Sequence, residues 1–540
     1  VFRMQLARPW KLESSMSFKH LRIMGSVRLV VVLLLLPFLF SAEKASVAGE
    51  RELKSLGDGK SWQTAVYIND SDKPGPVVIV IGGVHGNEPA GARAAYQIRH
   101  WPIQKGKLIV IPQLNVAALD ANTRFTPDAI DEQKDLNRNF PYLGIAEHSR
   151  GEIAKEVWQF VVDQNPDWLF DLHEGYEFNV SHQPKSGQAK SVGSTIICDV
   201  SRQSGAMTQR MLAAANQLVS DPDRQFVLKG RGPKKTTLAA AVINVLDKPA
   251  MILETTHQFQ RLPVRTRQHR AMMNAALRQL GMIDADCLHL MTPAGDIKRQ
   301  KSYVAVYDDS GASERGVKTV TGVLENDCDI EVAHLDARDI REEILPQFDV
   351  VLFGGGSGSK EAAAIGSVGS EAVRHFVMNG GGYVGICAGA YLCSAHYKWS
   401  LNLIDTHVFT GTKQVEGLGP KSMWYRGGVT TQRMQLTERG QDVFEEVGEH
   451  LRVRYHNGPI VSPRGMEGLN PYTVLSWFRS EKVLYPPQEG TMINTPAIVI
   501  GDYGKGKVIS ISPHPESTDG LESMLPSAIR AVRRMDSSDF

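Results

Sequence analysis

Residues 76–91 read PVVIVIGGVHGNEPAG, a continuous apolar run that ends in glycines and polar side chains. Such a run, bounded by turn residues, is typical of a strand that is buried on both faces in an α/β sheet. A helical pattern over residues 89–101 follows at once. This order of strand, glycine turn and helix predicts a layered α/β fold with polar groups at the carboxyl end of a strand.

The same alternation continues along the chain. Four more buried strands are predicted at 107–115, 167–175, 194–200 and 249–257, with helical patterns at 149–164, 204–220 and 267–282. Further strand-and-turn units follow at 302–309, 329–336, 348–356 and 381–390. The sequence therefore predicts an α/β protein with two layered domains, at 49–291 and 302–540, joined by a polar linker at 292–301.

Composition limits the classes of partner. The 540 residues carry 60 Lys and Arg against 59 Asp and Glu, for a formal net charge of +1. This balance offers no support for a nucleic-acid partner, which needs a clustered basic face. The five cysteines are odd in number and form no CxxC pair, so a disulfide framework is not expected.

Residues 1–48 have the pattern of a secretory signal peptide. An apolar run from Leu29 to Phe40 follows a basic stretch and is too short for a comfortable membrane span. Small residues at 46–48 offer a cleavage site. We expect a secreted or periplasmic protein whose natural start is Met16 or Met24. An uncleaved membrane anchor is the alternative, and it would be the only contact with the membrane.

Three potential metal ligands lie near predicted strand ends. His85 and Glu88 are three residues apart on the glycine turn, and such a pair points the same way as the turn opens into a helix. His173 ends another apolar strand, where α/β sheets place ligand-binding groups. A short-spaced pair with a distant third ligand suits a catalytic zinc site, although surface polar residues often give the same HxxE pattern.

Other polar residues complete this constellation. Arg124 and the run 135–139, DLNRN, precede His173, and Glu254 ends the apolar strand at 249–257. A carboxylate at such a position is costly unless it faces a polar cleft. A zinc hydrolase needs these parts: a metal-activated water, a carboxylate to take its proton, and cations for the oxyanion and for substrate charge.

The motifs HGNE, TR, DLNRNF, DLHEG and MILETT, in this order, resemble the zinc carboxypeptidase superfamily over about residues 60–283. Within it they are most similar to the bacterial peptidase branch and to the succinylglutamate desuccinylase/aspartoacylase branch. The resemblance implies a carboxypeptidase-like mixed sheet and a zinc ion bound by His85, Glu88 and His173.

The same resemblance assigns roles to the remaining residues. Glu254 would be the general base, and Arg124 would stabilise the oxyanion of the tetrahedral intermediate. Asn137 and Arg138 would hold a free carboxylate of the substrate, for which the planar fork of arginine is suited. Asp135 would orient the first histidine ligand.

Two departures from the family leave the substrate open. The desuccinylase/aspartoacylase branch normally adds a small β domain over the cleft, whereas this chain continues into a second α/β domain. Carboxypeptidases place a tyrosine before the base, where this chain has KGRGPKKTTLAAA. Arg231, Lys234 and Lys235 in that loop either meet an acidic substrate or are simply solvated. A metallocarboxypeptidase and an N-acyl-amino-acid deacylase both remain open.

A cysteine marks a second candidate site. In YVGICAGAYL, Cys387 lies at a predicted strand-to-helix corner between Gly385 and Gly389. A nucleophile elbow needs small neighbours at this corner, and the amides of the following helix favour a thiolate. His514 and Glu516 follow another apolar run and supply a base and an orienting carboxylate.

The pattern G-x-C-x-G, followed by H-P-E, resembles the class I glutamine amidotransferase fold. It is more similar to the biotin-protein ligase N-terminal-like domain, over about residues 302–530, and YHNGP at 455–459 supports this. The resemblance implies a flavodoxin-like fold with Cys387, His514 and Glu516 as a triad. The long separation of cysteine and histidine implies an insertion near 396–450. No synthase partner is recognisable, so a live thiol hydrolase and a binding module remain equal alternatives.

The sequence thus predicts an exported zinc-dependent hydrolase that cleaves an amide bond adjacent to a free carboxylate, with a zinc-bound water activated by Glu254. Its substrate would be a small peptide or an N-acyl amino acid. The alternatives are a two-domain binding protein with silent pockets and an enzyme whose activity resides at Cys387.

Overall fold

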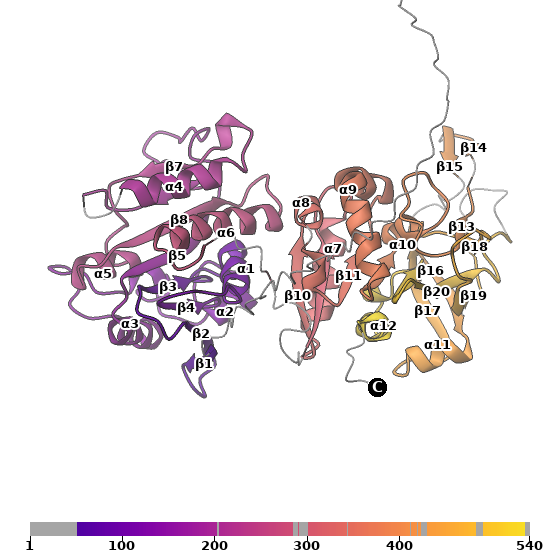
Figure 1. Cartoon of the computed structure of the whole chain (residues 1–540), viewed down its shortest axis with the longest axis horizontal. Coiled ribbons are helices and arrows are strands. Elements are labelled where there is room, and N and C mark those ends of the chain that lie inside the picture. The colour runs from indigo at the N-terminus through magenta and orange to yellow at the C-terminus, as the bar shows by residue number, and fades with distance from the viewer. Residues whose placement is uncertain are drawn as a thin grey trace, which may run out of the picture. The chain divides into compact units, whose positions relative to one another are not determined.

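The computed structural model describes residues 51–201, 205–284, 290, 301–342, 344–410, 412–417, 419–422, 429–481 and 490–534. These residues form two α/β domains whose main sheets are separate (Figure 1). The predicted signal segment, and all of the predicted linker except its last residue, lie outside the described residues. Within the described ranges, no helix has the length and apolar character that a membrane span requires.

The first domain is built on a mixed sheet of eight strands in the order β1-β2-β4-β3-β5-β8-β6-β7. These are β1 (Arg51–Leu56), β2 (Thr64–Asp70), β3 (Val77–Ile81), β4 (Lys107–Ile111), β5 (Trp168–Gly175), β6 (Thr195–Ile197), β7 (Val227–Lys229) and β8 (Ala250–Thr256). The central pairs β3–β4, β3–β5 and β5–β8 are parallel, whereas β1–β2, β2–β4 and β6–β8 are antiparallel. The predicted α/β class is confirmed.

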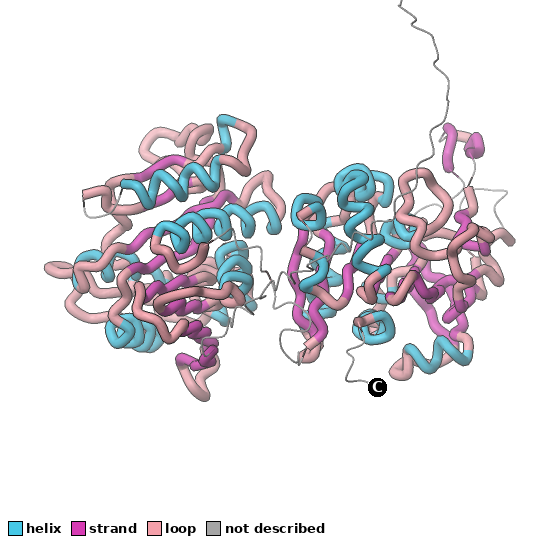
Figure 2. The backbone as a smooth tube through the Cα atoms, in the orientation of Figure 1, coloured by secondary structure: helices cyan, strands magenta, loops and turns pink. Residues whose placement is uncertain are grey.

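Helices flank the strands of this sheet (Figure 2). They are α1 (Pro89–Ile98), α2 (Val116–Asp120), α3 (Glu152–Gln164), α4 (Gly205–Asn216), α5 (Leu238–Val245) and α6 (Leu262–Gln279). α1, α4 and α6 contribute to one hydrophobic core, and α3 and α5 to another. Val78 and Val80 of β3 belong to the first core, and Ile79 and Ile81 to the second. This two-sided burial is why the strand reads as one continuous apolar run.

Three strands of this sheet have no counterpart among the predicted apolar runs: β1, β2 and β7. In β1, at the edge of the sheet, Glu52, Leu53 and Lys54 are exposed. The residues of β7, at the other edge, are intermediate or exposed. In β2 the burial alternates over part of the strand. Strands that face solvent do not need a continuous apolar sequence, so this signal misses them.

The second domain has a sheet of nine strands in the order β10-β9-β11-β12-β21-β20-β19-β16-β17. These are β9 (Ser302–Tyr307), β10 (Ile330–Leu335), β11 (Val350–Phe353), β12 (Gly382–Ile386), β16 (Val429–Leu436), β17 (His450–His456), β19 (Thr473–Phe478), β20 (Pro496–Tyr503) and β21 (Gly506–Ile511). The pairs from β10 to β21 are parallel, and those from β21 to β17 are antiparallel. The antiparallel half therefore includes strands from the region of the predicted insertion.

Smaller elements complete this domain. Two short sheets pair β13 (Thr406–Val408) with β18 (Val461–Pro463), and β14 (Thr412–Val415) with β15 (Gly419–Ser422). The helices are α7 (Glu314–Glu325), α8 (Ala337–Arg341), α9 (Gly358–Met378), α10 (Ala388–Cys393), α11 (Glu438–Val443) and α12 (Met524–Val532). α7 packs with α12, and α9 packs with both α8 and α10. α10 begins directly after β12, so Cys387 is the one residue between strand and helix.

Candidate metal centre and a cysteine site

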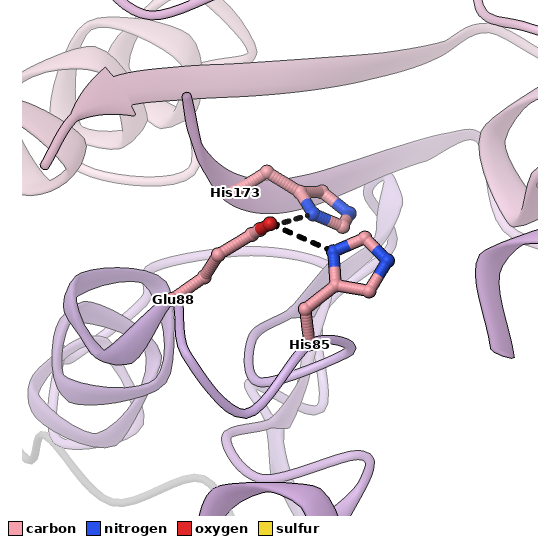
Figure 3. A group of neighbouring side chains, drawn as sticks. All are labelled: His85, Glu88 and His173. Atoms are coloured by element: carbon pink, nitrogen blue, oxygen red, sulfur yellow. Dashed lines mark hydrogen bonds and ion pairs between the residues drawn. The ribbon is translucent and has the colours of Figure 1, made fainter. Parts of the chain in front are cut away.

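The three predicted ligands lie together at the carboxyl ends of β3 and β5, which are parallel neighbours. His85 and Glu88 are on the turn between β3 and α1, and His173 is near the end of β5 (Figure 3). Glu88 Oε1 lies 2.9 Å from His85 Nδ1, and Glu88 Oε2 lies 2.8 Å from His173 Nδ1. One ligand atom from each residue lies within 4.8 Å of the others, and all three side chains are buried.

Carboxylates hold the outer nitrogens of both imidazole rings. His85 Nε2 lies 3.1 Å from Asp135 Oδ1, and His173 Nε2 lies 2.9 Å from Asp171 Oδ2. Each ring is therefore fixed between one of these carboxylates and Glu88. Such partners set the tautomer and orientation of histidines that bind metals.

The pKa values at this centre follow from these contacts. Burial opposes the ionisation of Glu88, but His85 and His173 hold the pKa of its carboxyl well below the usual value. Burial also opposes the charged ring of His173, yet Asp171 and Glu88 raise its pKa well above the usual value. Although burial acts against it, the hydrogen bond with His85 lowers the pKa of Asp135 to about 2. At each of these three groups, the interaction with its charged partners therefore shifts the pKa more than burial does.

Glu254, the predicted general base, lies on β8 directly beside His173. The two residues are register partners in the parallel pair of β5 and β8. Glu254 is buried and lines the same cavity as the three ligands. Burial, reinforced by the Glu88 carboxylate and opposed by His173, raises the pKa of Glu254 to about 8. Its carboxyl therefore holds a proton more tightly than an ordinary glutamate does.

The predicted substrate-binding residues lie around the same cavity. Arg124 Nη1 donates to Glu88 Oε1 at 2.8 Å, and Arg138 donates to the carbonyl of Asn137. The Asn137 amide lies 3.0 Å from His173 Nε2, and its oxygen accepts from the N–H of Leu238 at 2.9 Å. Asn137 thus contacts the framework of the site, and its role toward a substrate carboxylate stays a prediction.

The basic loop between β7 and α5 contains Arg231, Lys234 and Lys235, and the structure places these three residues differently. Lys234 is exposed and lines the cavity at the metal ligands. Lys235 lies over the ring of Tyr142 at 5.6 Å, and the backbone of Arg231 pairs with that of Asp199 in an isolated β-bridge. Of these three residues, only Lys234 lines the cavity at the metal ligands.

The cavity itself is small, with a volume of about 130 Å³. Its lining includes the ligands, the base and the predicted substrate-binding side chains, namely His85, Glu88, Arg124, Asn137, Arg138, His173, Lys234 and Glu254. Sites for drug-sized ligands have volumes of roughly 300–1,000 Å³, so this cavity is smaller than a site for a whole ligand of that size.

Sequence reasoning missed three residues that support this centre: Asp171, Glu174 and Arg265. Asp171 precedes His173 by two residues on β5, and residues two apart on a strand face the same way, so the D-x-H spacing is a signal for it. Glu174 accepts from the N–H of Ala90 at 2.8 Å and from Arg265. That pair joins β5 to α6, and no local pattern marks it.

The turn that carries the first two ligands requires glycine. A Cβ on Gly86 would lie 1.7 Å from the carbonyl oxygen of Ala118. In the first turn of α1, a Cβ on Gly91 would lie 2.3 Å from the carbonyl oxygen of Leu172. Gly83 has a φ of +67°. The backbone passes so close to neighbouring carbonyl groups here that a residue larger than glycine does not fit.

The donor set fits a metal ion. Two imidazoles and one carboxylate are the three protein ligands of many catalytic zinc sites, and they leave one coordination position for water or substrate. Both outer nitrogens already have carboxylate partners, as ligating histidines require. Among the described residues, one other group of metal-ligating type occurs, at 327–329, and it is largely exposed.

The second domain brings Cys387, His514 and Glu516 together around one cavity. Cys387 has a φ of +51°, a strained conformation for a residue other than glycine. A Cβ on Gly385 would lie 2.5 Å from the Gly389 carbonyl oxygen, and one on Gly389 would lie 2.1 Å from that of Phe353. The G-x-C-x-G spacing therefore allows α10 to pack against β11 and β12 at this elbow.

His514 Nδ1 lies 2.8 Å from Glu516 Oε1, and its Nε2 has no hydrogen-bond partner among the described residues. The Cys387 thiol donates to the carbonyl of His456 at 3.5 Å. Burial disfavours the charged ring, but the interactions with Cys387 and Glu516 outweigh it and raise the pKa of His514 to about 10. Gly355, in the run of three glycines at 354–356 that follows β11, borders both side chains. A Cβ there would lie 3.1 Å from His514 Cε1 and 4.0 Å from Cys387 Cβ.

The cysteines of the described residues form no disulfide bonds. Cys198, Cys328 and Cys393 are free thiols, as is Cys387, and Cys287 lies outside the described residues. Cys328 is exposed, whereas the other three are buried. Cys328 is thus an internal reference for thiol reactivity.

These observations define a two-domain α/β protein with a hydrolase-type metal centre in its first domain. Residues 74–281 match the family model of the succinylglutamate desuccinylase/aspartoacylase catalytic domain. Residues 302–537 match the model of the biotin-protein ligase N-terminal domain. The two matches confirm the resemblance to the succinylglutamate desuccinylase/aspartoacylase branch over the first domain, and to the biotin-protein ligase N-terminal-like domain over the second.

The chain is also similar to solved structures. A variant of cell shape determinant protein Csd4 from Helicobacter pylori is 18% identical, with a TM-score of 0.34 and coverage of 46% of this chain and 68% of that one. Product-bound Csd4 gives the same identity and TM-score, with coverage of 47% and 66%. Succinylglutamate desuccinylase/aspartoacylase from Rhodobacter sphaeroides is 19% identical, with a TM-score of 0.29 and coverage of 44% and 65%. No curated protein matches the chain.

Proposed function

We propose that the first domain is a zinc-dependent hydrolase that cleaves an amide bond adjacent to a free carboxylate. One observation carries the proposal: His85, Glu88 and His173 converge within 4.8 Å, with Glu254 as the register partner of His173. The family match of residues 74–281 supports hydrolysis as the class of reaction. Two histidines and one glutamate support zinc as the metal.

The residues of the chain have distinct tasks in this reaction. Zinc held by His85, Glu88 and His173 would supply Lewis acidity toward a carbonyl group and toward water. Glu254, which lines the cavity at the three ligands, takes a proton from the attacking water and returns it to the leaving amine. Arg124, at the edge of the ligand cluster, donates hydrogen bonds to the developing oxyanion.

The proposed substrate is a small peptide or an N-acyl amino acid. Arg138 lines the cavity and offers a planar pair of N–H donors to the free carboxylate. Lys234 adds a second positive charge at the mouth, which favours a substrate with further negative charge. The cavity of about 130 Å³ admits the reacting end and leaves the rest of the substrate outside.

Metal content and hydrolysis test this proposal together. We expect about one zinc per chain by elemental analysis, and a loss of that zinc in His173→Ala. Glu254→Gln keeps the metal but lowers amide hydrolysis by about 10²–10⁴-fold, because the base is removed without the ligands. The substrates are C-terminal peptides and N-acyl amino acids, and the preferred set separates a carboxypeptidase from a deacylase.

Two matched variants serve as controls. His148→Ala and Glu132→Gln change exposed residues of the same types, and both should keep zinc and activity. If the wild-type chain holds zinc but hydrolyses no member of either substrate set, the first domain is a binding module. If it holds no zinc under any reconstitution, the proposed metal centre is wrong.

We also propose that the protein is exported and acts as a secreted or periplasmic enzyme. The support is the pattern of residues 1–48, with its short apolar run and its small residues at 46–48. Expression of the full chain with fractionation of the cells tests this. A mature protein that begins near Gly49, outside the cytoplasm, is the expected result, and an uncleaved chain in the membrane fraction would identify an anchor instead.

A further inference from the structure

A second cavity of the first domain lies at the carboxyl ends of β5 and β8, the parallel strands that carry His173 and Glu254. Its volume is about 690 Å³, against about 130 Å³ at the metal ligands. Residues 176–178 of its lining directly follow β5, and residues 258 and 259 follow β8. The volume falls within the range of sites for drug-sized ligands, roughly 300–1,000 Å³, and the proposed hydrolysis makes no use of it.

Two exposed aromatic rings line this cavity. Tyr176 is 66% exposed and Phe259 is 73% exposed. Among the phenylalanine, tyrosine and tryptophan side chains of the described residues, these two are the most exposed. An exposed ring forgoes the burial that ordinarily stabilises such a side chain. Two of them at one cavity therefore indicate a surface that a ligand covers.

The backbone beneath both rings is held in place. The N–H of Gln258 donates to the carbonyl of Tyr176 at 3.1 Å, which ties the loop after β8 to the loop after β5. Phe259 has a φ of +60°, a strained conformation for a bulky residue. The amide of Gln260 donates to the carbonyl of Thr256 at 2.9 Å and closes this turn. A ligand therefore meets rings on ordered backbone, which lowers the entropy lost on binding.

The charged groups of the cavity are largely paired within its own wall. Glu177 Oε2 lies 3.0 Å from His182 Nε2, and Asp221 Oδ2 lies 3.0 Å from Arg224 Nε. The one lysine of the lining balances its third carboxylate in charge. A ligand with a large net charge has no complementary field here, so the lining favours a neutral ligand.

The uncharged polar lining consists of a hydroxyl group and three amides, from Ser181, Gln183, Gln188 and Gln258. A glutamine amide has two donors and a carbonyl acceptor, which match neighbouring hydroxyl groups of a ligand. An apolar ligand would leave these groups without partners, at a cost in free energy. The C–H bonds on one face of a sugar ring carry partial positive charge, and the face of an aromatic ring is negative, so the two stack.

We infer that the first domain binds a neutral saccharide in this cavity, stacked on Tyr176 and Phe259 and hydrogen-bonded to the amides of the lining. The site is a neighbour of the metal centre. Val192 lines the metal cavity, and Ser191 beside it donates to the carbonyl of Glu177, in the wall of the saccharide cavity, at 2.6 Å. None of the saccharide-binding residues is a metal ligand or the proposed base, so the site goes beyond the proposed hydrolysis and does not rest on it.

Calorimetric titration of the full chain with neutral tetrasaccharides is the test. The probes are tetramers of β-linked glucose, of β-linked N-acetylglucosamine and of α-linked glucose. At least one should bind with a Kd below about 1 mM. Tyr176→Ala and Phe259→Ala should each weaken that binding by about 3–10-fold, whereas Tyr176→Phe keeps the ring and should bind as the wild type does. Phe125→Ala is the matched control, because it removes an exposed ring that lines neither cavity.

The outcomes separate this site from the metal centre. Glu254→Gln, which lacks the proposed base, should bind the saccharide as the wild type does. No binding of any probe at about 10 mM would overturn the inference, as would equal affinities of the wild type, Tyr176→Ala and Phe259→Ala. Neutral peptides with aromatic side chains and blocked ends are titrated in parallel. If they bind at these rings and the saccharides do not, the saccharide assignment is wrong. Circular dichroism checks that each variant is folded.

Discussion

The two sites of this protein are built on the same plan but are held together differently. Each lies where a parallel strand ends and a helix begins, with closely packed glycines nearby: Gly86 in the turn of the first site, and Gly385 and Gly389 on either side of Cys387 in the second. The metal centre is crowded, and its charges are paired with one another. The cysteine site has one strained nucleophile beside a broad cavity. A metal needs several side chains to converge, whereas a nucleophile needs one fixed atom and space for its substrate.

The largest expected effect on stability comes from replacing a closely packed glycine at either site by alanine. Gly86→Ala places a Cβ 1.7 Å from the Ala118 carbonyl oxygen and should destabilise the fold by about 3 kcal/mol or more. Gly389→Ala meets the Phe353 carbonyl oxygen at 2.1 Å and should act similarly on the second domain. Thermal unfolding, zinc content and Cys387 alkylation measure which site each variant damages.

Gly354→Ala is the matched control for this prediction. A Cβ at Gly354 has no neighbour within 4 Å, and its φ lies outside the positive range. Both sites should therefore survive this change. Equal stability of Gly86→Ala and Gly354→Ala would show that the turn relaxes more easily than the structure indicates.

The next effect concerns an unpaired acid in the second domain, in contrast to the paired acids of the metal centre. Glu361 on α9 is fully buried, and neither carboxyl oxygen has a hydrogen-bond partner among the described residues. Burial raises its pKa from 4.5 to about 8. Between these pH values the folded protein keeps a proton that the unfolded chain releases. Its contribution to stability is therefore complete below about pH 4.5 and is lost as the pH rises through 8.

Glu361→Gln should remove this dependence on pH. Because a pKa unit corresponds to about 1.4 kcal/mol, the variant should be more stable than the wild type by a few kcal/mol at pH 9 and about equal to it at pH 4. Urea unfolding at several pH values measures the difference. The exposed Glu467→Gln is the control and should follow the wild type. A constant difference at all pH values would mean that Glu361 is ionised in the folded protein.

A smaller effect is expected from the carboxylates behind the two histidine ligands. Asp171→Asn and Asp135→Asn should each weaken zinc binding by about 10–100-fold, because the outer nitrogen of one ring loses its carboxylate. Competition with a chelator measures the affinity. Alkylation of Cys387 should not change in either variant. Zinc affinity equal to that of the wild type would show that the rings are oriented by other contacts.

The smallest effect is expected at Lys234, which is exposed at the mouth of the first cavity. Lys234→Ala should raise the KM for acidic substrates by about threefold without changing kcat, because an exposed charge contributes less than about 1 kcal/mol. The effect should shrink at high salt. Lys235→Ala is the matched control, since Lys235 lies over Tyr142 instead. Equal KM values for the two variants would assign the whole loop to solvent.

Much of the metal centre could be read from the sequence because its parts are local. Buried parallel strands read as apolar runs, and the polar residues that end those runs lie at one edge of the sheet. His85, His173 and Glu254 were found in this way. Glu174 and Arg265 were not, because their contact joins β5 to α6 across 91 positions of sequence. Strand β1 was missed because an exposed edge has no apolar run.

The sequence alone determined the α/β class, the two families and the residue types available for chemistry, because periodicity and short motifs are local properties of the chain. The tertiary structure decided which of those residues meet. Backbone contacts at Gly86 and Gly389 permit the two turns, strand register sets Glu254 beside His173, and the elbow holds Cys387 at a positive φ. These outcomes depend on atoms far apart in the chain, so no local pattern contains them.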